Sequence, residues 1–505
     1  MRSKKAMLNS IFALILEMVT IACGFILPRL IMQNFGSAYN GTVAAITQFL
    51  SCVALLRAGV CAVTRASLYK PLAEKNIAEV SAIVRATEIF MRKTAGFFVG
   101  IVLIVAVGYP FLILDQFSWI STFLLVIILS ASTFIQYFFG ITYQTLLSAD
   151  QSQYVISIIQ VVTTLLNAII AVILINSGCS IHIVKLGSAL VFAANPLFTY
   201  FYVKKKYNID RSAKPNNDAL AQRWDALAFQ ISFFVNENTD LVLLSFFTNT
   251  KEISVYTVYA LVGKGVKKII QTFTSGMEAV FGNMLAQKED NNLRKKFNAF
   301  ECFVFAISTI GFVSAALLVV SFVGIYTKGI NDANYIRPLF AYVFFAGEFF
   351  FCVRIPYQYV VQAAGHYKQT RNGAIFEAVL NIVVSVIFVM WLGLIGVAIG
   401  TLCAMIFRTV QYSVYMSRNI IKRSLSVFIK KMLISLVNVV LIVLAVNLLP
   451  LPMVDNYFKW AVNALLVAVV ATIITLAINF IFYHKELKTI IAVLKNTLKK
   501  KNKTA

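Results

Sequence analysis

What this 505-residue sequence lacks limits the functions open to it. Only 13% of its residues are charged, about half the usual share for a soluble protein, and it contains only three histidines. Its seven cysteines form no CxxC pair and no Cys/His spacing, so no metal site or disulfide is expected. No GxxxxGK[ST] phosphate loop occurs, which excludes an ATP-driven pump of that type, and we expect no cofactor.

Apolar residues make up 59% of the chain, and they are grouped in recurring runs of about 20 residues. Helices of that length cross a bilayer because all their backbone polar groups are satisfied internally. We therefore predict an all-α polytopic membrane protein with about 14 transmembrane helices. The predicted spans are 8–33, 42–64, 89–114, 118–146, 153–176, 181–203, 225–248, 254–280, 297–326, 336–362, 373–391, 394–416, 427–449 and 459–483.

The net charge of +24 comes from cations that are concentrated in alternate loops. With a cytoplasmic N-terminus, 33 of the 45 Lys and Arg residues lie in inner segments and four in outer loops. This is the positive-inside pattern, and an even number of spans places both termini in the cytoplasm. The cations form no basic face between aromatic stacking platforms, so nucleic acid is not an expected partner. The lysine-rich tail is typical of a segment that binds anionic membrane lipids.

Polar interruptions predict the domain organisation. The longest one, 204–224, separates an N-terminal lobe of six spans (1–203) from a C-terminal lobe of six (225–416). A final region, 417–505, holds one more helix pair and the basic tail. The first apolar segment is too long for a signal peptide and no cleavage site follows it, so we interpret it as a retained helix.

Several charged residues lie inside the predicted spans, where an ionisable side chain usually faces a cavity or a partner. Arg57 lies eight residues before Arg65, about 12 Å deeper along a helix, which is too deep for easy snorkelling. It either pairs with Glu17 at similar depth or faces a cavity, and the two interpretations are compatible. Arg29, after Pro28, lies near the outer end of the first span.

The eighth predicted span is the most polar. Lys264, Lys267 and Lys268 have i, i+3, i+4 spacing, which places them on one helical face. Lys264 lies near mid-bilayer between Gly263 and Gly265, where small residues leave room for a ligand or a neighbouring helix. We expect Lys264 to face water or substrate, whereas snorkelling can explain Lys268; Lys267 and Lys268 are further candidate cavity residues.

Carboxylates are also predicted at membrane depth. Glu237 and Asp240 lie on one side of the seventh span and either neutralise the nearby lysines or couple transport to protons or sodium. Glu348, near the middle of its span, is a further candidate cavity residue. Arg354 and Arg408 lie in the inner halves of their spans, where they are expected to snorkel.

An excess of cations inside the membrane favours an anionic ligand. Phosphate is the natural candidate, because arginine binds it with a bidentate fork and lysine as a point charge.

Four segments carry a resemblance to a known family. Gly59 and the following SLYKPLAEKN resemble the end of the second span in polysaccharide repeat-unit flippases of the O-antigen (Wzx) type. These belong to the multidrug/oligosaccharidyl-lipid/polysaccharide exporter superfamily. The other matching segments are PRLIMQNFGSAYNGTVAAITQFL (28–50), NTDLVLLSFFTNTKEISVYTVYALV (238–262) and GHYKQTRNGAIFEAVLNIVVSVIFVMWLGLIGVAIGTL (365–402).

The resemblance implies an alternating-access flippase for an undecaprenyl-diphosphate-linked oligosaccharide. It would act in the bacterial cytoplasmic (inner) membrane, in export of O-antigen, capsule or another polysaccharide, with polymerase and chain-length proteins as possible partners. Related lipid II flippases hold the diphosphate with arginines on their first, second and eighth spans, which implies this role for Arg29, Arg57 and Lys264. Their last two spans form a lipid-tail groove, which would correspond to 427–483.

Two other classes of function fit the sequence less well. A cation-coupled multidrug or small-molecule exporter of the same superfamily is the alternative, although its cavity would favour carboxylates over cations. A membrane polymerase or glycosyltransferase would need catalytic carboxylates on sizeable outer loops. No outer loop exceeds about ten residues by the span count above, so we expect a transporter and not an enzyme.

Overall fold

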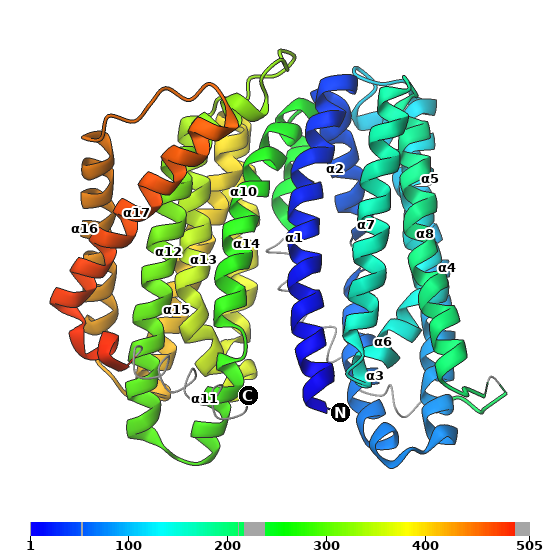
Figure 1. Cartoon of the computed structure of the whole chain (residues 1–505), viewed down its shortest axis with the longest axis horizontal. Helices are drawn as coiled ribbons and strands as arrows, with labels where there is room; N and C mark the ends of the chain where they lie inside the picture. The colour runs from blue at the N-terminus through cyan, green and yellow to red at the C-terminus, as the bar shows by residue number, and fades with distance from the viewer. Residues whose placement is uncertain (1, 52–53, 211, 217–237, 490–505) are drawn as a thin grey trace. The chain divides into compact units, whose positions relative to one another are not determined.

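The computed structural model describes residues 2–51, 54–210, 212–216 and 238–489, and helices dominate it (Figure 1). These residues contain no β-strand, and eleven of their helices are long and apolar enough to cross a membrane. The predicted all-α polytopic membrane fold is therefore confirmed.

The chain divides into two compact units, of which unit 1 comprises Met1–Val255 and Gly329–Ala333. Its helices are α1 (Arg2–Phe35), α2 (Ser37–Ser51), α3 (Ala54–Glu74), α4 (Ile77–Leu112), α5 (Trp119–Ile135), the π-helical η1 (Gln136–Gly140), α6 (Ile141–Ala149), α7 (Gln153–Asn176), α8 (Ile181–Lys206) and the short Asn238–Phe247. Within it, α1 packs on α7, α7 on α8, and α5 on α4 and α8. Leu68, Val84 and Leu146 are central to one of its buried apolar clusters.

A sharp turn separates α1 from α2. Gly36 has a φ of +92°, which a residue with a Cβ rarely adopts, and its N–H donates to the Met32 carbonyl. Directly after it, the Ser37 N–H and Oγ donate to the two carboxylate oxygens of Asp332, at 2.7 and 2.6 Å. Asp332 thus satisfies a backbone donor at the N-terminus of α2, where negative charge is favourable.

Unit 2 comprises Tyr256–Lys328 and Asn334–Ala505. Its helices are α10 (Thr250–Thr274, whose first turns belong to unit 1), α11 (Met277–Ala286), α12 (Asp290–Tyr326), α13 (Pro338–Ala363), α14 (Tyr367–Leu392), α15 (Leu394–Asn419), α16 (Ser426–Asn447) and α17 (Tyr457–Phe482). In it, α15 packs on α13 and α14, while α16 and α17 pack on α12 and on each other.

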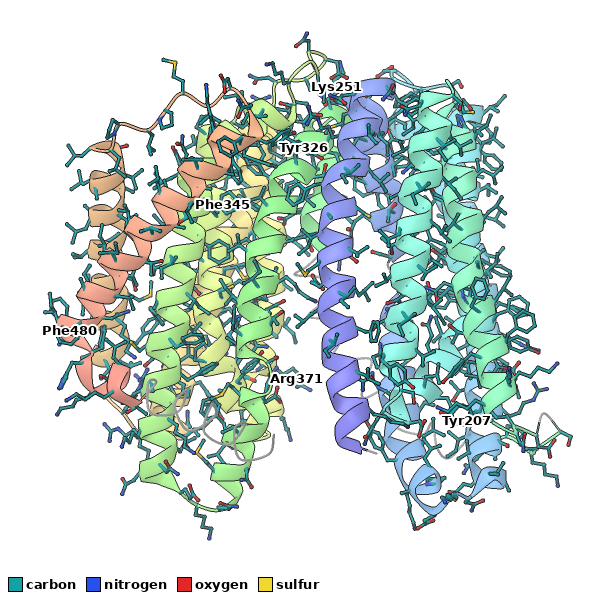
Figure 2. All side chains as sticks on the ribbon, viewed as in Figure 1. Tyr207, Lys251, Tyr326, Phe345, Arg371 and Phe480 are labelled. Carbon is teal, nitrogen blue, oxygen red and sulfur yellow. The ribbon has the colours of Figure 1, made fainter. Side chains whose placement is uncertain are left out.

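Burial in unit 2 follows the requirements of a membrane. Phe345 of α13 is 1% exposed and lies among the helices, whereas Phe480 of α17 is 70% exposed at their edge (Figure 2). Large apolar side chains on the outside of a helical bundle are expected where the surrounding solvent is hydrocarbon.

Three predicted spans are absent from the eleven long apolar helices. The span 42–64 corresponds to α2 and α3, which are separated by the undescribed residues 52–53. The span 225–248 falls mostly outside the described residues. The span 254–280 corresponds to α10 and α11, and its three lysines make α10 too polar to count as a long apolar helix.

Candidate functional site

Two of the predicted diphosphate-binding cations lie in unit 1. Arg29 on α1 and Arg57 on α3 both have half-buried side chains. Arg57 lies within electrostatic range of Tyr137 in η1 and of Cys61, one turn further along α3. This places a guanidinium inside an apolar helix and beside the π-helical segment, where a bound anion would be attracted.

Glu17 lines a polar cavity of about 340 Å³ inside unit 1. Residues of α1, α5, η1, α7 and α8 form its walls, and eight of the eleven lining residues are polar. The amides of Gln136, Gln160 and Asn195 come from η1, α7 and α8 in turn. Such a concentration of neutral polar groups among membrane helices indicates a place that is wet or occupied by a polar ligand.

The structure separates the three lysines of the predicted span 254–280, all of which lie on α10. Lys264 and Lys268 are exposed, whereas Lys267 is 8% exposed. The Lys267 Nζ lies 3.2 Å from Glu348 Oε2 on α13 and 4.2 Å from the centre of the Phe351 ring. Lys267 and Glu348 therefore compensate each other's charge at close range, and Lys264 remains an exposed cation of α10.

The two glycines beside Lys264 have different environments. A Cβ on Gly263 would lie 2.5 Å from Phe344 of α13, so this glycine allows α10 and α13 to pack closely. A Cβ on Gly265 would meet nothing within 4 Å. Space for a ligand next to Lys264 is therefore found on the Gly265 side.

Of the two predicted coupling carboxylates, Glu237 lies outside the described residues. Asp240 lies in the helix Asn238–Phe247 of unit 1 and is 7% exposed. In the same helix, the Asn238 Oδ1 accepts a hydrogen bond from the Gln48 amide of α2. The first turn of this helix is thus joined to α2 by side-chain polar contacts.

Arg354 and Arg408 do not snorkel, contrary to our expectation. Arg354 Nη1 lies 2.6 Å from Glu377 Oε1, and Arg408 Nε lies 3.2 Å from Glu377 Oε2. All three side chains are at least 93% buried, and together they join α13, α14 and α15. Both arginines stay inside because a shared carboxylate compensates their charge.

A second buried ion cluster, which the sequence did not predict, surrounds Glu301 of α12. Its carboxylate accepts hydrogen bonds from Arg423, Lys431 and the Tyr357 hydroxyl, and Lys431 Nζ lies 2.6 Å from Glu301 Oε2. Glu301 itself is fully buried. The cluster fixes the start of α16 to α12 and α13.

One sequence signal could have found this cluster. Glu301 is a lone carboxylate within the predicted span 297–326, and such a residue needs a buried cation. Arg423 lies between the predicted spans 394–416 and 427–449 and Lys431 lies at the inner end of the second, where cations are expected for orientation alone.

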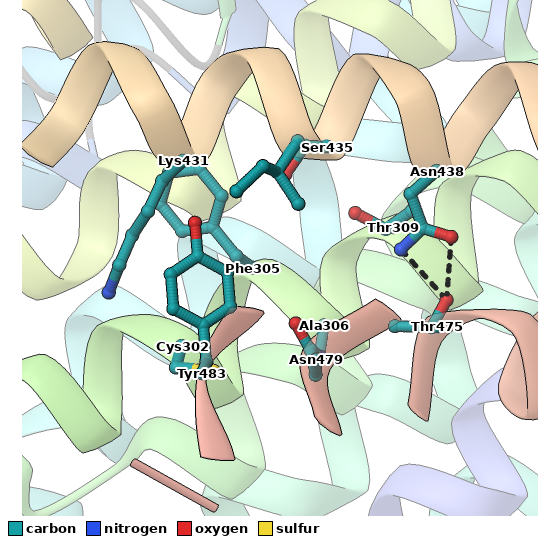
Figure 3. Close-up of a pocket in the computed structure, with 11 residues that line it drawn as sticks. Cys302, Phe305, Ala306, Thr309, Lys431, Ser435, Asn438, Thr475, Asn479 and Tyr483 are labelled. Atoms are coloured by element: carbon teal, nitrogen blue, oxygen red, sulfur yellow. Dashed lines mark hydrogen bonds between the residues drawn. The ribbon is translucent and has the colours of Figure 1, made fainter. Parts of the chain in front are cut away.

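Two further pockets lie in unit 2 around α16. The small pocket lies between α12, α16 and α17, and its lining includes Lys431, Asn438 and Thr475. The side chains of Asn438 and Thr475 are hydrogen bonded to each other across it (Figure 3). The other is an apolar groove of about 340 Å³ between α12, α13 and α16, with Phe312 and Phe349 in its wall. Its lining suits a hydrocarbon chain.

Known structures were compared with this arrangement of helices. The lipid II flippase MurJ in an inward closed conformation aligns over 95% of this chain and 100% of its own, with a TM-score of 0.68 at 17% identity. An inward-facing multidrug resistance MATE family transporter of the MOP superfamily aligns over 80% of this chain and 95% of its own, with a TM-score of 0.59 at 13% identity. For the Vibrio cholerae MATE transporter VcmN, the coverages are 83% and 99%, with a TM-score of 0.56 at 14% identity.

The chain has the fold of these transporters. No protein-family model and no curated protein matches its sequence.

Proposed function

We propose that the protein is a flippase that moves an undecaprenyl-diphosphate-linked oligosaccharide from the inner to the outer leaflet of the bacterial cytoplasmic membrane. The observation that carries the proposal is the position of Arg57 on α3 and Lys264 on α10, both within predicted membrane spans, in a fold shared with a lipid II flippase. Cations at this depth are costly unless they meet an anion or water.

In this proposal Arg57 and Lys264 bind the diphosphate and Arg29 assists. Arginine offers a bidentate fork to phosphate oxygens, and lysine adds a mobile point charge. The buried pair of Lys267 with Glu348 is structural and leaves Lys264 as the ligand. The lobes 1–203 and 225–416 exchange inward- and outward-open states by rocking about this site.

We also propose how the protein is oriented in the membrane and which proteins it works with. Both termini are cytoplasmic, and proteins of polymerisation and chain-length control receive the cargo on the outer side. The apolar groove beside α16 is where we place the polyprenyl chain of the cargo. Asp240, together with Glu237, is the candidate for proton or sodium coupling.

The experiment compares complementing variants in a strain that lacks the protein. Its lipids are extracted and examined by mass spectrometry for lipid-linked oligosaccharide on the cytoplasmic side. The double variant Arg57→Ala/Lys264→Ala should abolish export and leave membrane insertion intact, whereas Arg371→Ala, an exposed cation of α14, should export normally. Normal export by the double variant would refute the site.

A second candidate function is export of cationic drugs or other small molecules, coupled to a cation gradient. It is favoured by the shared MATE fold and by Glu17, a carboxylate in the polar cavity of unit 1. The same deletion strain distinguishes the two functions. Accumulated lipid-linked oligosaccharide with unchanged drug susceptibility supports the flippase, whereas greater sensitivity to cationic drugs without accumulation supports the exporter.

A further inference from the structure

The polar cavity of unit 1 contains two amide side chains without a hydrogen-bond partner among the described residues. Gln136 and Gln160 are both half-buried, and within the described residues neither side chain forms a hydrogen bond to the protein. Two other polar residues of the cavity do have partners. The Thr163 hydroxyl donates to main-chain carbonyls of its own helix, and the Asn195 Oδ1 lies 3.5 Å from the Gln144 amide nitrogen. The Gln136 and Gln160 amides both face the cavity, so their hydrogen bonds are made either to water or to a polar ligand that enters it.

The backbone is shaped to place one of these amides. Gln136 begins η1, where α5 widens into a π-helix before α6. A Cβ on Gly140, at the end of η1, would lie 2.5 Å from the Pro196 Cβ, so only glycine lets η1 pack this closely on α8. Such π segments are rare and recur at functional sites.

The chemistry of the lining selects among possible occupants. Amides both donate and accept hydrogen bonds, as sugar hydroxyls do, while the Glu17 carboxylate can accept from two hydroxyls. Phe192 adds an aromatic face for the C–H side of a sugar ring. A transition-metal ion is a poorer fit, because the described part of the chain holds no group of three or more His, Cys, Asp or Glu side chains. The volume of about 340 Å³ lies within the range of small-ligand sites.

We propose that this cavity is a saccharide subsite, in which Gln136 and Gln160 read the hydroxyls of the first sugars of the lipid-linked cargo. This inference rests on the proposed flippase function and adds the element that determines specificity. A site built to hydrogen-bond hydroxyls discriminates strongly, because a cargo without them leaves both amides unpaired.

The test measures the affinity of the purified protein, in lipid nanodiscs, for two probes. One is the lipid-linked oligosaccharide that accumulates in the deletion strain, and the other is undecaprenyl diphosphate without sugar. The native protein should bind the first probe more tightly. Gln160→Leu should weaken binding of the glycosylated probe roughly tenfold, as expected for the loss of one buried hydrogen bond, and leave binding of the bare lipid unchanged.

Controls separate the possible failures. Gln153→Leu makes the same change on the exposed first turn of α7 and should not alter either affinity. Unchanged binding of bare lipid also shows that Gln160→Leu is folded. Equal affinity of the native protein for both probes, or an equal loss for both in Gln160→Leu, would overturn the saccharide subsite while the flippase proposal stands. Binding of neither probe by the native protein would refute the flippase proposal and the subsite with it.

Discussion

At the scale of single residues, Glu301 is the side chain whose charge matters most to the fold. It compensates two cations, Arg423 and Lys431, that are both at least 94% buried, and it accepts from Tyr357. Removing one partner of a buried pair leaves uncompensated charge and typically costs about 3–5 kcal/mol. We predict that Glu301→Gln lowers the melting temperature of the purified protein by several degrees, measured by differential scanning fluorimetry.

The matched control is Glu74→Gln at the exposed end of α3, which should melt like the native protein. If Glu301→Gln has the same melting temperature as the native protein, water or a neighbouring group already compensates the charges of Arg423 and Lys431.

The sequence predicts which charged residues lie at membrane depth, but it does not predict their partners. A charge inside an apolar run is visible in the sequence, so Glu17, Arg57, Lys267 and Glu348 were all recognised as candidates. Their partners were not, because pairing depends on which helices pack together. Glu348 is a cavity candidate by position, yet the packing of α13 on α10 makes it the counter-ion of Lys267.

At the scale of helices, Asp150 joins three segments that are distant in sequence. Between α6 and α7, its carboxylate accepts from Tyr207 and Ser152 and lies 3.0 Å from Lys5 Nζ of α1 and 3.4 Å from Lys206 Nζ of α8. Partial burial raises the pKa of Asp150, but the hydrogen bonds from Tyr207, Lys5 and Ser152 outweigh it and hold this pKa below its ordinary value. A lowered pKa means that the carboxylate stabilises the folded state at neutral pH.

We therefore predict that Asp150→Asn loosens the start of α1. The ion pairs are partly exposed, so the expected loss of local stability is about 1 kcal/mol. This corresponds to roughly fivefold faster hydrogen exchange in the first turns of α1 at pH 7. The difference from the native protein should persist down to the ordinary Asp pKa of about 3.9 and shrink as the pH falls through the lowered pKa of Asp150. Asp210→Asn, in the exposed segment after α8, is the control that should not change exchange in α1. Equal exchange in Asp150→Asn and the native protein at pH 7 would refute the junction.

Helices were the most predictable features of the chain, because length and hydropathy are local properties. The spans 153–176 and 394–416 correspond closely to α7 and α15. One feature depends on packing instead and was missed. The π-helical η1 lies within a stretch that reads as one continuous apolar helix, 118–146.

At the scale of the whole molecule, the all-helical membrane fold was predictable and the site was not. The excess of apolar residues and the alternating loop charge depend on the bilayer alone. A binding site between lobes depends on contacts among helices far apart in sequence, so the joint role of Arg29, Arg57 and Lys264 stays a prediction. The division into lobes 1–203 and 225–416 also stays a prediction.

The proposed rocking motion has a specific requirement at the predicted outer side. The loop Gly329–Ala333 belongs to unit 1, while α12 and α13 on either side of it belong to unit 2. Its Asp332 caps α2 through Ser37. We predict that this loop, which is covalently tied to α12 and α13, follows these helices when the outer side opens and so separates Asp332 from Ser37.

We therefore predict that a disulfide between cysteines at Ser37→Cys and Asp332→Cys, in a background without the native cysteines, stops polysaccharide export. Reduction with dithiothreitol should restore it, as measured by surface polymer in the complemented deletion strain. The control pair is Ser121→Cys with His182→Cys, two residues of unit 1 that are hydrogen bonded at 3.2 Å and should move together. Locking the control pair should leave export intact, because both of its helices lie within one lobe. Continued export with the Ser37–Asp332 positions fully cross-linked would mean that this loop moves with unit 1, and that the outer side opens elsewhere.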